Sequence, residues 1–179
     1  MIPFAAPAEI YSEWIRNMIE NGPDAPFPDP GGKERPRTLT EGDLMLSVPV
    51  AGGAASLKRK YLTNPVISGH GRWQDVHLGA LKAAYGKAPY FIHFFPALEE
   101  IYGGMSTGSL EKFNLKLHQT VCDGLGLDPV LIEMLREMPT EDLERLRRIG
   151  GEKRRIINMK HSILEVLFRL GKEGMLVLI

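Results

Sequence analysis

Residues 73–86 read Trp73-Gln-Asp-Val-His77-Leu-Gly-Ala-Leu81-Lys-Ala-Ala-Tyr85-Gly86. Apolar and aromatic side chains recur there every three or four positions, which is the spacing of one face of an α-helix. The positions on that face are Trp73, Val76, His77, Ala80, Leu81, Ala84 and Tyr85. Gly86 is a stop signal. The stretch therefore predicts an amphipathic helix that buries an aromatic face.

The helical pattern continues toward the C-terminus. Pro89 and Pro96 each suit a first helical turn, so residues 90–102 predict two short helices or one kinked helix. Thr107 or Ser109 can cap the next helix, which stops at Gly126. Residues 130–135 are ambiguous between strand and helix.

The last third of the chain also carries helix signals. A helix starting at Thr140 is predicted to end at Gly150-Gly151, with three arginines in its last turn. Ser162-Ile-Leu-Glu165 is a capping box that opens an apolar helix ending at Gly171. Residues 175–179 are too apolar to lie in solvent, and we expect them to pack back on the domain, as a strand in one interpretation.

The N-terminal third predicts strands and loops around one helix. Residues 2–5 suit a short strand and residues 10–19 a helix that ends at Asn21-Gly22. The Pro- and Gly-rich stretch 22–36 predicts an exposed loop, either mobile or a lid. Residues 44–50 alternate as a strand does, and Pro49 indicates an edge or a bulge. Residues 51–56 predict a flexible turn, and residues 64–72 a loop.

Together these elements predict an α/β fold, with α+β as the variant, in which helices pack on a small mixed sheet. At 179 residues, with no repeat and no clean boundary, the chain is expected to form a single domain over 1–179. Cys122 stands alone in an apolar helical pattern, which favours a buried thiol and a cytoplasmic protein.

Charge and hydropathy exclude some classes of function. Lys plus Arg number 22 and Asp plus Glu number 22, so there is no net field to attract nucleic acid. No run approaches the ~20 apolar residues of a membrane span. The five histidines and the single cysteine show no ligand spacing, so we expect no metal.

The order of several segments resembles the WbqC-like protein family of bacteria. The matching set is Leu46-Ser-Val-Pro-Val50, Trp73, His77, Ala84-Tyr85, Pro89-Tyr-Phe91, Leu98-Glu99, Tyr102, Leu110, Asn114, Ser162-Ile-Leu-Glu-Val-Leu-Phe168, Gly171 and Glu173. The resemblance implies a role in building surface polysaccharide such as O-antigen. It also implies a protein that handles activated sugars or attaches small groups to them.

The chain departs from the family pattern at several polar positions. The aromatic and basic residues expected after His77 are Leu78 and Gly79, and an acidic residue expected before Asn114 is Lys112. The polar stretch before residue 46 is largely replaced by the Pro/Gly loop, in which only Arg35 and Arg37 keep an Arg-x-Arg pattern. If those positions bind ligand in typical members, this chain has an altered or lost activity.

His77, Tyr85 and His93 are the candidate catalytic residues. His77 and Tyr85 are eight positions apart, about two helical turns, so they can share one side of a helix. A histidine among aromatic residues and a carboxylate can act as a general acid or base near neutral pH. The competing interpretation is that both fill a buried helix face with their polar tips hydrogen-bonded, and we favour it.

Basic residues from three loops are the candidate ligand-binding set, together with Asn114. They are Arg35, Arg37, Lys58, Arg59, Lys60 and Arg72. If they converge, they would bind phosphate or another anion, which a nucleotide sugar supplies. Residues 51–58 fail the phosphate-loop pattern because no Gly precedes Lys58, and a solvated loop is the simpler interpretation.

Two hypotheses of function follow. The first is an enzyme that transfers a small acyl or similar group onto a sugar, with the basic loops holding the anion and a histidine moving the proton. The second is a non-catalytic binding or assembly protein, or a degenerate family member whose site has eroded. The sequence identifies no cofactor and leaves the oligomeric state unknown. A concave pocket lined by His77 and Tyr85 would favour the first hypothesis, and a closed core the second.

Overall fold

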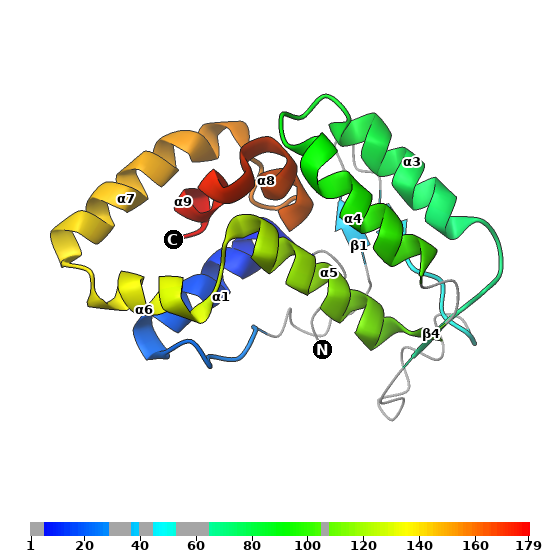
Figure 1. The fold of residues 1–179 in the computed structure, drawn as a ribbon, viewed down its shortest axis with the longest axis horizontal. Helices are drawn as coiled ribbons and strands as arrows, with labels where there is room; N and C mark the ends of the chain where they lie inside the picture. The colour runs from blue at the N-terminus through cyan, green and yellow to red at the C-terminus, as the bar shows by residue number, and fades with distance from the viewer. Residues whose placement is uncertain (1–5, 29–36, 40–44, 53–64, 105–107) are drawn as a thin grey trace.

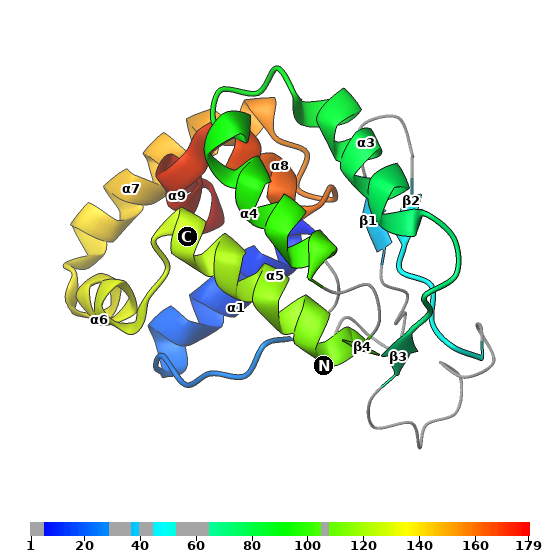
Figure 2. The same cartoon turned by 45° about the vertical axis from the view of Figure 1, so that its right-hand side comes forward.

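The computed structural model describes residues 6–28, 37–39, 45–52, 65–104 and 108–179. It confirms a mixed α/β chain that is mostly helical, with 69% of the described residues in helices. The strands lie at one end of the molecule, beside α3 and the start of α5 (Figures 1 and 2). The other end is formed by α6 and α7 (Figure 1).

Helix α1 (Ala8–Asn21) covers the C-terminal helices, and it ends at Gly22 as predicted. Its start is tied to the segment before α8 by Ala8 N–H donating to His161 O at 2.9 Å and Ile163 N–H to Ala6 O at 2.9 Å. Ser12 Oγ donates to Leu178 O at 2.7 Å. The two ends of the sequence are therefore packed together by buried polar and apolar contacts.

The described strands form two small antiparallel sheets instead of one mixed sheet. Strands β1 (Arg37–Leu39) and β2 (Met45–Ser47) pair with each other, as do β3 (Val66–Ile67) and β4 (Gly108–Ser109). The stretch 64–72 is thus not wholly a loop, because Val66 and Ile67 pair with Ser109 and Gly108. Pro49 lies just past β2, where its carbonyl accepts from Ser68 N–H at 2.9 Å.

Helices α3 (Trp73–Tyr85), α4 (Phe91–Gly103) and α5 (Leu110–Leu125) form the middle of the fold and agree closely with the sequence periodicity. Helix α4 is one element with Pro96 inside it. Ser109 caps α5 by accepting from Lys112 N–H at 3.2 Å. Gly126 ends α5 with φ 69°, a left-handed conformation that glycine adopts without strain.

Helix α8 (Ile163–Leu170) is the most deeply buried element, and only Arg169 in it is not buried. Ser162 Oγ accepts from Leu164 N–H at 3.2 Å, as a helix cap does. The carboxylate of Glu165 contacts His161 Nδ1 at 2.6 Å and Arg169 Nε at 3.2 Å. A short 3-10 turn (Gly171–Glu173) then leads to α9 (Gly174–Leu178). The C-terminal segment packs back as predicted, but as a helix and not as a strand.

Helices α6 (Pro129–Glu137) and α7 (Thr140–Lys153) follow α5, and a 3-10 turn (Arg154–Ile156) continues α7. Residues 130–135, ambiguous in the sequence, are helical: Asp128 caps α6 by accepting from Leu131 N–H at 2.8 Å. The predicted end of α7 at Gly150-Gly151 is wrong. A Cβ at Gly150 would lie 1.6 Å from Leu176 O, so this glycine lets the backbones of α7 and α9 touch.

Some expectations lie outside the described residues. They concern the strand at 2–5, the loop from 29 to 36, residue 44, most of the turn at 51–56, and Thr107 as a cap. Among the helices that the described ranges form, none has both the length and the apolar character that a bilayer span requires.

Candidate functional site

Three residues that carry the family resemblance meet in space, together with Phe113, although they come from separate segments. Trp73 and His77 of α3, Tyr102 of α4 and Phe113 of α5 form one cluster, which we call the Trp-His-Tyr cluster. Ring centroids are 5.2 Å apart for Trp73 and His77, 5.8 Å for His77 and Tyr102, and 5.2 Å for Tyr102 and Phe113. Edge-to-face geometry, as between Trp73 and His77, is favourable for such rings.

His77 is held at the centre of this cluster and is 3% exposed. Its Nδ1 lies 3.2 Å from the Tyr102 hydroxyl. Burial lowers the pKa of His77 to about 4, although a hydrogen bond with the backbone of Ser47 acts to raise it. Since that bond raises the pKa, the ring N–H donates to the Ser47 carbonyl. The ring is therefore neutral at pH 7.

This arrangement connects three elements through one imidazole. Helix α3 carries the ring, α4 supplies the hydroxyl, and Ser47 in β2 supplies the carbonyl. Burial also raises the pKa of Tyr102 far above its usual value, so the hydroxyl keeps its proton. The buried, neutral imidazole of His77 therefore joins α3 to α4 and to β2.

The other candidate catalytic residues are not brought together with His77. Tyr85 is 1% exposed and packs on Phe168, with ring centroids 5.4 Å apart. His93 is exposed on α4, beside Tyr90 at a ring distance of 6.3 Å. His77 and Tyr85 thus share the buried face of α3 as the spacing predicts, whereas His93 faces solvent.

Little of the basic set lies in the described part of the chain. Arg35, Lys58, Arg59 and Lys60 lie outside it, and of Arg37 only the backbone, in β1, is described. Arg72 precedes α3 and its Nε pairs with Asp75 at 2.7 Å, both side chains being well exposed. Convergence of these residues on an anion stays a prediction.

Asn114 is 3% exposed on α5, and its Oδ1 accepts no hydrogen bond from the described residues. Trp73 is 8% exposed, and its indole N–H likewise has no acceptor among them. A buried polar atom left unpaired costs about 1–3 kcal/mol, and folded proteins contain few. These two atoms are therefore the unusual polar features of this region.

A second buried polar cluster, which the sequence did not predict, joins α1 to α5. Tyr11 Oη lies 2.8 Å from His118 Nδ1, and His118 Nε2 lies 3.5 Å from Cys122 Sγ. Burial lowers the pKa of His118 to about 4 and raises that of Cys122 to about 12, with Asp123 contributing to the latter. All three groups are neutral at pH 7. The only signal in the sequence was the i, i+4 spacing of His118 and Cys122.

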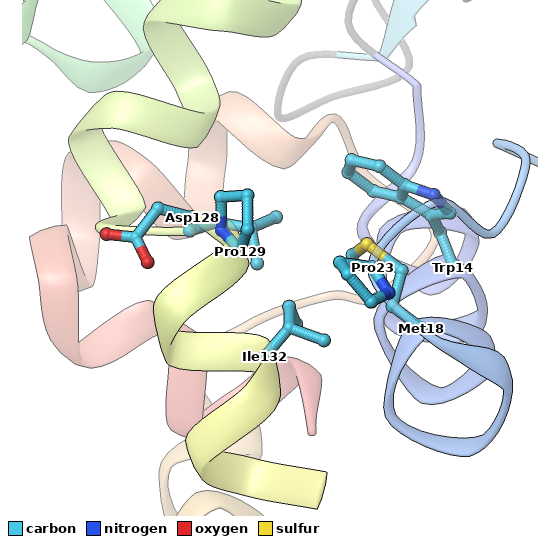
Figure 3. A pocket seen from close by; sticks show the side chains of 7 residues that line it. Trp14, Met18, Pro23, Asp128, Pro129 and Ile132 are labelled. Atoms are coloured by element: carbon cyan, nitrogen blue, oxygen red, sulfur yellow. The ribbon is translucent and has the colours of Figure 1, made fainter.

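A small pocket lies between α1 and α6 (Figure 3), and it adjoins the second cluster because the ring of Trp14, which lines it, is 5.1 Å from that of His118. It encloses about 130 Å³, and its lining residues are Trp14, Met18, Pro23, Leu127, Asp128, Pro129 and Ile132. The carboxylate of Asp128 points away from the space and caps α6 (Figure 3). The lining is thus almost wholly apolar and includes neither His77 nor Tyr85.

Within the described ranges, no three His, Cys, Asp or Glu side chains are grouped as metal ligands would be. No curated protein and no solved structure matches the chain significantly. The sequence profile of the WbqC-like protein family matches residues 24–173, a span that contains the Trp-His-Tyr cluster and Asn114. The chain therefore belongs to the WbqC-like protein family.

Proposed function

We propose that this WbqC-like protein is a non-catalytic binding member of its family. Its ligand is an anionic small molecule such as a nucleotide sugar, and its role lies in surface-polysaccharide metabolism. The family resemblance supports the class of ligand. The observation that carries the absence of catalysis is the state of His77, which is buried and hydrogen-bonded to Tyr102 and to the backbone of Ser47.

A general acid or base needs a nitrogen within reach of its substrate and a pKa near the working pH. His77 has neither, because its side chain is 3% exposed and burial lowers its pKa to about 4. Tyr85 is buried against Phe168, and His93 stands apart on the surface. Of the three candidates, His77 and Tyr85 are thus buried among packed side chains, which supports the non-catalytic proposal.

One observation favours the alternative, an enzyme that transfers a small group onto a sugar. The amide oxygen of Asn114 and the indole N–H of Trp73 have no partner in the described part of the chain, and a substrate that reached them could supply one. These atoms support a ligand site, but neither is a nucleophile or a base. They fit the binding role at least as well as the catalytic one.

The test compares His77→Ala with His93→Ala as a matched exposed control. Removing a buried ring and its two hydrogen bonds is expected to cost about 2–4 kcal/mol, or roughly 4–16 °C in Tm. His93→Ala should stay within about 0.5 kcal/mol of the parent. Both are also incubated with nucleotide sugars and acyl donors, with product followed by mass spectrometry.

The proposal expects ligand-induced stabilisation of the parent protein without product. Product that disappears in a stably folded His77→Ala protein would instead establish catalysis by His77. Product that persists in that variant would show an enzyme whose catalytic residues lie elsewhere in the chain. Either result removes the non-catalytic assignment.

A further inference from the structure

The pocket between α1 and α6 reaches from the surface into the core (Figure 3). Two of its lining residues are buried, Met18 at 3% and Ile132 at 1% exposure. Two others, Asp128 and Pro129, are exposed. Because the lining runs from exposed to buried side chains, a small solute can enter from the side of Asp128 and Pro129 and contact the core residues.

The lining side chains direct no unengaged polar group into this space. The Trp14 indole N–H donates to Ala25 O at 2.9 Å. The Asp128 carboxylate points away from the space and accepts from Leu131 N–H at 2.8 Å (Figure 3). A buried water molecule is held by two to four polar partners, which these side chains do not supply. Replacing such poorly held water by an apolar group is favourable.

The volume of the pocket limits what it can hold. It encloses about 130 Å³. An apolar cavity of about 150 Å³ is large enough for benzene, whereas sites for drug-sized ligands and cofactors enclose about 300–1,000 Å³. The pocket is therefore the size of one six-membered ring, and a whole nucleotide would not fit inside it.

The lining also favours an aromatic ring over a charged group. Trp14 already contacts two rings, Phe27 and His118, each with centroids 5.1 Å away. A ring in the pocket would extend this group of rings toward the surface, in contacts that aromatic pairs favour. The thioether of Met18 is a second favourable partner for an aromatic ring. An ionised group would lose its hydration there without gaining an opposite charge from the lining.

We propose that the pocket between α1 and α6 binds one uncharged aromatic ring of about the size of benzene, carried by a small molecule. The inference goes beyond the proposed function and does not rest on it. No lining residue belongs to the Trp-His-Tyr cluster or to the basic set.

The first experiment locates a simple aromatic probe on the unmodified protein. Fluorobenzene is titrated and followed by fluorine NMR, and nuclear Overhauser effects are measured between its ring protons and the protein. We expect contacts to the Trp14 ring, the Met18 methyl and the Ile132 methyl groups. Fluorobenzoate, which adds a negative charge to the same ring, should bind at least about tenfold more weakly. Hexane should compete less well than benzene.

A pair of variants on α6 then tests the space itself. Ile132→Phe places a ring where the ligand ring would lie, so fluorobenzene should bind at least about tenfold more weakly. Met134→Phe is the matched control: Met134 is 59% exposed, lies on the same helix and does not line the pocket. It adds the same side chain and should leave binding unchanged. Thermal unfolding checks that both variants are folded.

Three results would overturn the inference: no binding of fluorobenzene to the parent protein, contacts to residues outside the pocket, or equal binding by a folded Ile132→Phe. Fluorobenzoate binding as tightly as fluorobenzene would refute the uncharged class, and hexane competing better than benzene would refute the aromatic one. If Ile132→Phe does not fold, the contacts measured on the parent protein decide the question. None of these results bears on nucleotide-sugar binding, so this inference and the proposed function can fail separately.

Discussion

Replacing Gly150 by alanine tests how α7 packs on α9. Gly150 is buried, and the Cβ of an alanine there would lie 1.6 Å from Leu176 O and 2.5 Å from Leu176 C. Both are backbone atoms of α9, so no side-chain rotation can relieve the clash. The neighbouring Gly151 is exposed, and a methyl group there would meet no atom of the described residues within 4 Å. Gly151→Ala is therefore a matched control.

The expected loss of stability in Gly150→Ala follows from how far α7 and α9 must move apart. Real Cβ contacts are essentially never found below 3.0 Å, so the two backbones must separate by about 1.4 Å. Overpacking of this kind costs about 1–3 kcal/mol where side chains can adjust, and we expect at least about 3 kcal/mol against rigid backbone. For a chain of this size that is roughly 6–12 °C in Tm. Gly151→Ala should instead stabilise by about 0.5–1 kcal/mol, since alanine is the better helix former.

Thermal and urea unfolding of the two variants, followed by circular dichroism at 222 nm, measure the difference. Opposite signs for adjacent substitutions would locate the contact between α7 and α9 at Gly150. Equal stability of Gly150→Ala and Gly151→Ala would refute the packing described here. It would also restore the interpretation of Gly150-Gly151 as a helix end.

Other predictions address the buried polar groups and a helix cap. With its pKa raised from 9.0 to about 12, Cys122 should be about 1,000-fold less ionised at pH 7 than an ordinary thiol. It should react with a disulfide reagent only after urea unfolding, and rapid labelling of the native protein would contradict its burial. His77 and His118 have pKa values lowered from 6.5 to about 4, so the unfolded chain binds more protons between these values and stability falls as pH falls. For each histidine, the free energy of unfolding should fall by about 3 kcal/mol between pH 7 and pH 4. A urea midpoint that does not move between pH 7 and pH 4.5 would contradict both lowered pKa values. Ser109→Ala should cost about 1 kcal/mol through the lost cap on α5, which urea unfolding measures; an unchanged midpoint would mean that this cap adds nothing.

The helices were largely predictable because their signals are local. Apolar spacing identified α3 and α5, and Ser109 and Gly126 marked the two ends of α5. The same local logic failed at Gly150, because a glycine that ends a helix and a glycine that admits a neighbouring backbone look alike in sequence. It failed at α9 as well, since a five-residue apolar run has no periodicity to separate helix from strand.

The candidate site, like the helices, was predictable only in part. Its residue types were visible in the chain: Trp73 and His77 stand on one helix face, and Asn114 lies within the family resemblance. Their hydrogen-bond partners could not be predicted from the sequence, because hydrogen bonds between distant segments leave no local pattern. Tyr102 is 25 positions from His77, and Tyr11 is 107 positions from His118.

The sequence by itself thus determined the helical framework, the neutral charge balance and the family, all of which depend on residue type and spacing along the chain. Only the tertiary structure decided that His77 is locked between Tyr102 and Ser47 and that His93 faces solvent. It also decided that Asn114 and Trp73 keep buried polar atoms without partners in the described part of the chain. The physical reason is that burial and hydrogen bonding depend on which elements pack together, and periodicity shows which face of a helix is buried but not what covers it.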